Sequence, residues 1–100
     1  MKKNFELNDV AEITDSEWDL LTEITKETRS EKVIACLREN KNVPITAVGL
    51  FGSEDQNSGQ IRPNGLFLKH KLPFLLTRIG ELDKTAWRGL RLMALVRKTE

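Results

Sequence analysis

A chain of 100 residues that is 39% hydrophobic and 31% charged has the size and composition of one small globular domain. No apolar stretch approaches the roughly 20 residues of a membrane span, and the first residues lack the apolar core of a signal peptide. One cysteine and one histidine supply neither an internal disulfide nor enough soft ligands for a metal ion. We therefore expect a cytoplasmic protein with no metal and no cofactor.

The net charge of +1 conceals two parts of opposite sign. Residues 1–31 hold nine acidic and four basic residues, whereas residues 32–100 hold six acidic and twelve basic residues. The second part would attract a polyanion, although two solvated surfaces can also differ in sign without any function. We therefore divide the chain into an acidic N-terminal arm and helix, residues 1–30, and a nucleic-acid-binding-like domain, residues 31–100.

The first predicted element is a helix over residues 15–28. Thr14 followed by Glu17 has the spacing of a capping box, in which each side chain satisfies a free backbone N–H of the other. Apolar residues then recur at the spacing of one helical face, namely Trp18, Leu21 and Ile24.

Three β-like runs follow, separated by turn residues. In residues 32–39 apolar positions alternate, although a helix could also hold this run. The second run, residues 43–51, contains the strand formers Ile45, Thr46 and Val48. The third run, residues 60–69, is split by Pro63-Asn64-Gly65, which should bend the chain between two short strands.

The end of the chain predicts helix. Four aliphatic residues recur at i, i+3, i+4 and i+7, the pattern of a helical stripe; they are Leu72, Leu75, Leu76 and Ile79. Pro73 fits the first turn of such a helix. Asp83 could cap a second helix over residues 84–98.

The segment from residue 30 to residue 83 resembles the positive-cofactor-four family of transcriptional coactivators, which bind single-stranded DNA. The resemblance rests on the order of elements and on two stretches, Lys32-Val33-Ile34-Ala35-Cys36-Leu37-Arg38-Glu39 and Ile61-Arg62-Pro63 with Gly65-Leu66-Phe67-Leu68. It implies an α+β fold, a four-stranded curved antiparallel sheet followed by a C-terminal helix, to which the chain adds an N-terminal helix. It also implies a homodimer with these helices at the interface.

The resemblance implies phosphate contacts at Arg38, Lys41 and Arg62, and an aromatic ring for base stacking at Phe51. The alternation of residues 66–68 adds Phe67 as a second candidate for an exposed ring, because it faces away from its two leucine neighbours. Further cations lie along the same segment. The complete predicted nucleic-acid-binding set is Lys32, Arg38, Lys41, Phe51, Arg62, Phe67, Lys69 and Lys71.

The leading functional hypothesis is a small dimeric protein that binds single-stranded DNA or RNA, with a transcription or replication accessory role. The alternative is a protein–protein interaction module, an adaptor or inhibitor, on the same fold. A third interpretation makes residues 30–50 a helix–turn–helix for duplex DNA, with its turn at residues 40–44. We do not expect an enzyme, because no Ser, Cys or Asp has a recognisable catalytic spacing to His70.

Overall fold

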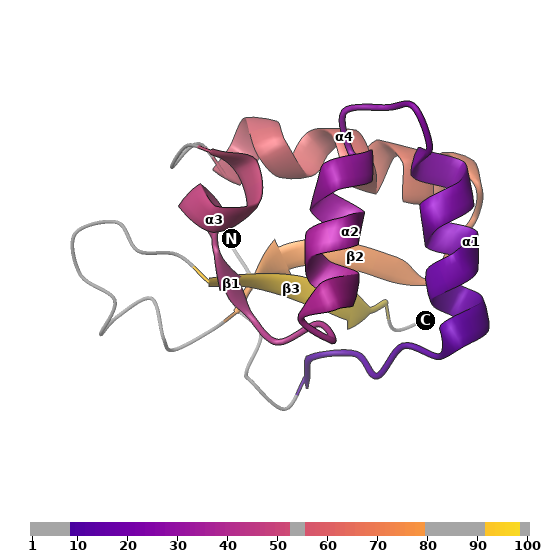
Figure 1. The fold of residues 1–100 in the computed structure, drawn as a ribbon, viewed down its shortest axis with the longest axis horizontal. Coiled ribbons are helices and arrows are strands. Elements are labelled where there is room, and N and C mark those ends of the chain that lie inside the picture. The colour runs from indigo at the N-terminus through magenta and orange to yellow at the C-terminus, as the bar shows by residue number, and fades with distance from the viewer. Residues whose placement is uncertain (1–8, 53–55, 80–91, 99–100) are drawn as a thin grey trace.

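The computed structural model describes residues 9–52, 56–79 and 92–98 (Figure 1). Within these residues, helices cover one face of a three-stranded sheet. The elements in chain order are α1 (Asp15–Thr25), α2 (Glu31–Glu39), β1 (Ile45–Thr46), α3 (Ala47–Phe51), α4 (Gln56–Lys69), β2 (Phe74–Arg78) and β3 (Leu92–Arg97).

Helix α1 forms where the sequence predicts it, although it ends at Thr25. Its capping box is confirmed, because the Glu17 backbone N–H donates to Thr14 Oγ1 at 3.2 Å and the Thr14 N–H donates to Glu17 Oε1 at 3.0 Å. Trp18 and Leu21 are buried on its inner face. Residue 27 then takes a left-handed backbone conformation, with φ 62°, and turns the chain toward α2.

The first predicted strand is wrong, and only two residues of the second form a strand. Residues 31–39 form α2, which buries Val33, Ile34 and Leu37 on one side. These positions, i, i+1 and i+4, lie on one helical face, which packs on α1, whereas in a strand Ile34 would face away from the other two. The second run contains only the two-residue strand β1 and then α3, whose Thr46 cap accepts the Gly49 N–H at 3.1 Å.

In the rest of the chain, the described segments that were predicted as strands form a helix, and those predicted as helices form strands. The third run is one helix, α4, with Pro63 inside it and buried. The predicted helix over residues 72–79 is mostly strand β2, in which Phe74 and Leu76 are buried on one face and Leu75 lies on the other. Of the predicted helix at residues 84–98, residues 92–97 are strand β3; the residues before them lie outside the described part.

The sheet has the order β1-β3-β2, and both pairings are antiparallel. Its helix-facing side buries Leu76 and Leu95. On the other side Ala94 and Val96 are also buried and pack with Val10. The predicted four-stranded curved sheet with a C-terminal helix is therefore wrong, although the fold is α+β. A sheet buried on both faces cannot present a row of cations to nucleic acid.

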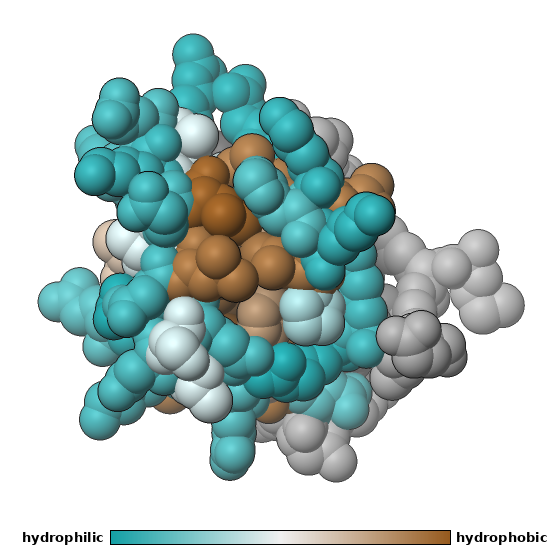
Figure 2. Space-filling view, turned by 90° about the vertical axis from the view of Figure 1, so that its right-hand side faces the viewer, coloured by the Kyte–Doolittle hydropathy of each residue, from teal (hydrophilic) through white to brown (hydrophobic). Residues whose placement is uncertain are grey.

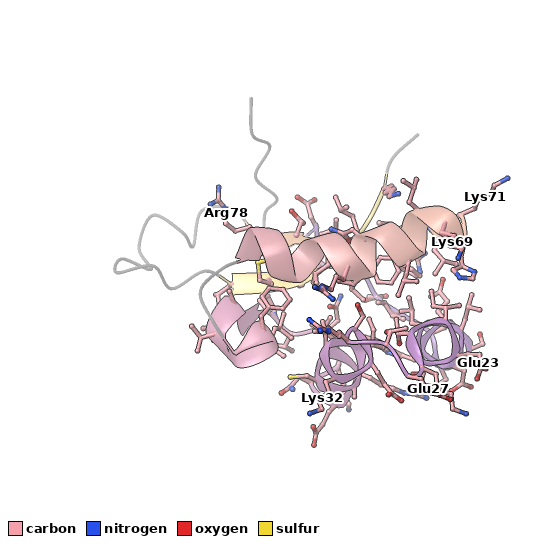
Figure 3. The ribbon with its side chains drawn as sticks, turned by 90° about the horizontal axis from the view of Figure 1, so that it is seen from above. Glu23, Glu27, Lys32, Lys69, Lys71 and Arg78 are labelled. Atoms are coloured by element: carbon pink, nitrogen blue, oxygen red, sulfur yellow. The ribbon has the colours of Figure 1, made fainter. Side chains whose placement is uncertain are left out.

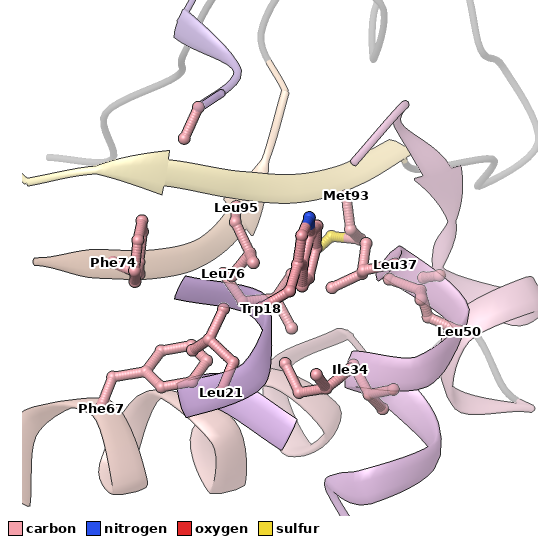
Figure 4. Close-up of a cluster of buried hydrophobic side chains, with 13 residues drawn as sticks. Trp18, Leu21, Ile34, Leu37, Leu50, Phe67, Phe74, Leu76, Met93 and Leu95 are labelled. Carbon is pink, nitrogen blue, oxygen red and sulfur yellow. The ribbon is translucent and has the colours of Figure 1, made fainter. Parts of the chain in front are cut away.

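The core lies between the sheet and the helices (Figure 4). Trp18 of α1, Phe67 of α4 and Phe74 of β2 all belong to one cluster. Full burial of each such side chain contributes on the order of 1.5–3 kcal/mol. None of the described helices is long and apolar enough to cross a membrane.

Candidate nucleic-acid interface

Helices α3 and α4 follow one another in the chain and contact each other. Residues 52–55 separate them, and Gly52 is the one of these four that the structure describes. Gly52 ends α3 in the left-handed conformation, with φ 76°, and its N–H donates to the Val48 carbonyl at 2.9 Å. Glycine adopts this conformation without the Cβ clash that other residues suffer, so Gly52 is suited to end α3.

A groove lies between the α1–α2 turn and α4. It has a volume of about 430 Å³. On α4 it is lined by Arg62, Gly65, Leu66 and Lys69, a spacing that places them on one helical face. The buried residues Pro63 and Phe67 hold the adjacent face of α4 against the core, and this orients the groove-lining face.

The other wall of the groove is the α1–α2 turn, with Thr28, Arg29 and Ser30. The lining residues together include three cations and no carboxylate. Arg29, Arg62 and Lys69 come from two separate segments, so their charges add where the segments meet. Such a concentration of one sign of charge in a concave site attracts anions.

Ser30 immediately precedes α2 and is only 2% exposed. Its backbone N–H donates to Thr28 Oγ1 at 3.1 Å. Its hydroxyl makes no capping bond to α2 and no hydrogen bond with any other residue of the described part. The first N–H groups of a helix have no partner inside the helix and carry partial positive charge. In α2 the Glu31 N–H donates to the Thr28 carbonyl at 3.2 Å, which leaves those of Lys32 and Val33.

Only two of the predicted site residues, Arg62 and Lys69, line this groove. Arg38 instead donates to Asp19 Oδ1 at 2.8 Å and to Thr22 Oγ1 at 3.2 Å, so it holds α2 against α1. Lys32 is exposed on the side of α2 away from α4 (Figure 3). The cations were expected to share one sheet, and they lie on separate surfaces.

The last two predicted cations lie in turns. Lys41 is exposed beyond the C-terminal end of α2 and has φ 54°. Lys71 follows α4 and has φ 57°. Figure 3 shows Lys71 near Lys69 at the C-terminal end of α4, but Lys71 does not line the groove.

The predicted stacking rings do not lie on an open surface. Phe67 is fully buried, so its prediction as an exposed ring is wrong. The alternation that suggested exposure applies to a strand, whereas residues 66–68 are helical, and Leu68 is the exposed residue at 70%. Phe51 is half-buried and packs against the core.

Arg29 and Ser30 were absent from the predicted set. A signal for them existed in the sequence, because Thr28-Arg29-Ser30 directly precedes an apolar run and serine is a preferred N-cap residue. Reading residues 32–39 as strand concealed it. Assigning that run to helix would have placed Ser30 at a helix start.

The acids of α1 are partly neutralised within the domain. Asp19 pairs with Arg38, and Glu17 binds Arg97 Nη2 through both carboxylate oxygens, at 2.8 and 3.0 Å. The hydrogen bond from Arg97, followed by that from the Thr14 backbone, lowers the pKa of Glu17. The opposite charges of the two parts of the sequence therefore form ion pairs that join α1 to α2 and to β3.

The described residues contain no cluster of His, Cys, Asp and Glu that could hold a metal ion. No protein-family model, curated protein or solved structure matches the chain. Its function is therefore inferred from geometry and charge.

Proposed function

We propose that this protein binds duplex DNA through the helix–turn–helix α3–α4, with α4 entering the major groove. The observation that carries this proposal is the position of α4. It follows α3 after residues 52–55, and one of its faces borders the cation-lined groove. The element order α2-β1-α3-α4-β2-β3, with the sheet order β1-β3-β2, is that of a winged helix–turn–helix.

The dimensions of α4 support this role. An α-helix with its side chains is about 10–12 Å across, and the major groove is about 12 Å wide. The 14 residues of α4 span about 21 Å at 1.5 Å per residue. In helix–turn–helix proteins the N-terminal residues of the second helix contact base edges.

This proposal keeps nucleic acid as the partner but changes the surface and the form of the nucleic acid. Binding of a single strand depended on an open sheet, and the observed sheet is covered on both faces. Binding of single-stranded nucleic acid therefore stays an untested prediction, and the open sheet that was its structural basis is not observed. The helix–turn–helix that we propose lies in residues 47–69, whereas the one considered from the sequence lay in residues 30–50.

Fluorescence anisotropy with a labelled duplex at several salt concentrations tests the proposal. We expect the logarithm of the binding constant to fall with the logarithm of the salt concentration, with a slope of about −0.9 per phosphate contacted. Arg62→Gln should weaken binding and reduce the slope by about one. The control Lys41→Gln removes the same charge outside the groove, so it should change binding little.

Two results would contradict the proposal. One is no binding of the duplex by tens of micromolar protein at low salt. The other is tighter binding of a single strand of the same length and sequence, which would restore the single-strand hypothesis.

A protein partner is the second candidate. Figure 2 shows an apolar area surrounded by hydrophilic residues on the side of the molecule where α1 lies. Leu20 of α1 and Leu68 of α4 are 46% and 70% exposed. Light scattering of the purified protein tests self-association. If the protein is a dimer and Leu68→Ser converts it to a monomer, this candidate is supported. If the wild type is a monomer at 100 µM, self-association is contradicted, and DNA binding would then involve the monomer.

A further inference from the structure

We propose that the groove between the α1–α2 turn and α4 holds one phosphate group with its attached sugar. Its ligands are the Ser30 hydroxyl, the N–H groups of Lys32 and Val33, and the surrounding cations; the Glu31 N–H is already bound to the Thr28 carbonyl at 3.2 Å. The phosphate could come from a DNA backbone or from a free nucleotide, because both present a phosphate with its sugar. In the first case the inference rests on the proposed function, and the experiment below separates the two cases.

The Ser30 hydroxyl is the first observation. It is buried and makes no hydrogen bond with the described residues. Buried polar groups are nearly always paired, since an unpaired hydroxyl has lost its water without compensation. A phosphate oxygen in the groove would accept this O–H. The same anion would meet the N–H groups that begin the nine-residue helix α2.

The charges around the groove are the second observation. Arg29 and Arg62 carry planar guanidinium groups, which bind phosphate through two parallel hydrogen bonds. Lys69 adds a third positive charge. Glu31 is the acid next to Ser30 in sequence, and its carboxylate is held by the Glu27 backbone N–H at 3.2 Å.

Gly65 is the third observation. Glycine inside a helix costs stability relative to alanine, so an interior glycine usually has a packing reason. Here a Cβ added to Gly65 would meet no atom within 4 Å. Packing within the protein therefore does not require glycine, whereas a side chain at this position would occupy space that a ligand in the groove needs. Leu66 beside it offers an apolar contact for the sugar, and a volume of about 430 Å³ exceeds what a bare phosphate fills.

Two substitutions test the site without damaging the fold. Ser30→Ala removes a hydroxyl that caps nothing, so the melting temperature should not fall. Gly65→Leu extends a side chain into the groove from a position with free space, and helix propensity favours it over glycine. The matched controls are Ser16→Ala, at an exposed serine in α1, and Lys41→Gln.

The probes are deoxythymidine monophosphate and a labelled duplex, each titrated into ¹⁵N-labelled full-length protein and followed by NMR. With either probe we expect the Lys32 and Val33 amides to shift, because they lie in the first turn of α2. Loss of one hydrogen bond to a charged group corresponds to about a tenfold weaker affinity for Ser30→Ala. Gly65→Leu should weaken binding at least as much, and both controls should match the wild type.

The outcomes separate the two proposals. Duplex binding that survives Ser30→Ala and Gly65→Leu keeps the helix–turn–helix and overturns the groove. Shifts of the α2 amides with the nucleotide, without any duplex binding, keep the groove and overturn the DNA proposal. If neither probe moves these amides, the groove is not a phosphate site.

Discussion

Asn42 and Asn64 hydrogen-bond the two members of one cross-strand pair. Leu76 of β2 lies opposite Leu95 of β3. Asn42 accepts the Leu95 N–H and donates to the Leu95 carbonyl, both at 2.9 Å. Asn64 accepts the Leu76 N–H at 2.7 Å and donates to the Leu76 carbonyl at 2.9 Å. Each side-chain amide thus replaces the neighbouring strand that this part of the sheet lacks.

Replacement of Asn42 should strongly destabilise the fold. Its side chain is buried and also donates to the Ala11 carbonyl at 2.9 Å. Asn42→Ala removes the partner of the Leu95 N–H and of the Ala11 carbonyl, whereas the Leu95 carbonyl still accepts the Ala11 N–H at 2.9 Å, so urea denaturation should show a loss of about 3 kcal/mol. Because φ is 61°, Asn42→Gly should recover about 1 kcal/mol of that loss. A loss below 1 kcal/mol for Asn42→Ala, comparable to that of the exposed Asn40→Ala, would contradict this role.

Replacement of Asn64 should expose the edge of the sheet. Strand β2 is at the edge, and the Asn64 amide covers its open side at Leu76. In Asn64→Ala we expect faster hydrogen exchange of the Leu76 amide and a loss of about 1–2 kcal/mol in stability. Asn42→Ala is the reciprocal control, since it should act first on the Leu95 amide. Equal acceleration at both amides in each variant would show global unfolding instead.

The Glu17–Arg97 pair predicts a pH dependence of stability. The pKa of Glu17 is lowered from its ordinary value of 4.5 in the folded protein. The folded state therefore favours the ionised carboxylate, and this stabilisation is complete above pH 4.5 and is lost as the pH falls through the lower folded pKa. Both side chains are partly exposed, so Glu17→Gln should cost only about 0.5–1 kcal/mol at pH 7.

Urea denaturation from pH 7 to pH 3 checks this prediction. The difference between the wild type and Glu17→Gln should be constant near neutrality and should shrink below pH 4.5. Glu23→Gln removes the same charge from an exposed site on α1 and serves as the control. If the difference in the free energy of unfolding between the wild type and Glu17→Gln grew as the pH fell, the prediction would be contradicted, because a lowered pKa requires it to shrink.

Phe67 should affect stability and not DNA binding. Its ring is fully buried in the core cluster, so Phe67→Ala should cost about 3–5 kcal/mol, and Phe67→Leu less than about 1.5 kcal/mol. We expect folded Phe67→Leu to bind the duplex with the affinity of the wild type. A large loss of affinity in this variant, with circular dichroism unchanged, would return the ring to the binding surface.

The sequence by itself determined helix α1 and its start. The capping box between Thr14 and Glu17 joins groups three residues apart, so it forms without help from the rest of the chain. The apolar stripe of α1 also has a clear helical period. Turn residues were also expected between the first two β-like runs, and Lys41 and Asn42 in that place have left-handed angles, which asparagine tolerates.

Only the tertiary structure decided the rest. Over a short length, the apolar residues of 32–39 and of 72–79 fit both a helical and a strand period. Packing against the rest of the domain made the first segment the helix α2 and most of the second the strand β2. The groove was equally hidden, because Arg29 and Arg62 are distant in sequence and meet only once α4 packs beside the α1–α2 turn. The spacing of apolar residues predicts the structure of one segment at a time. The groove depends instead on which segments pack side by side in the folded protein.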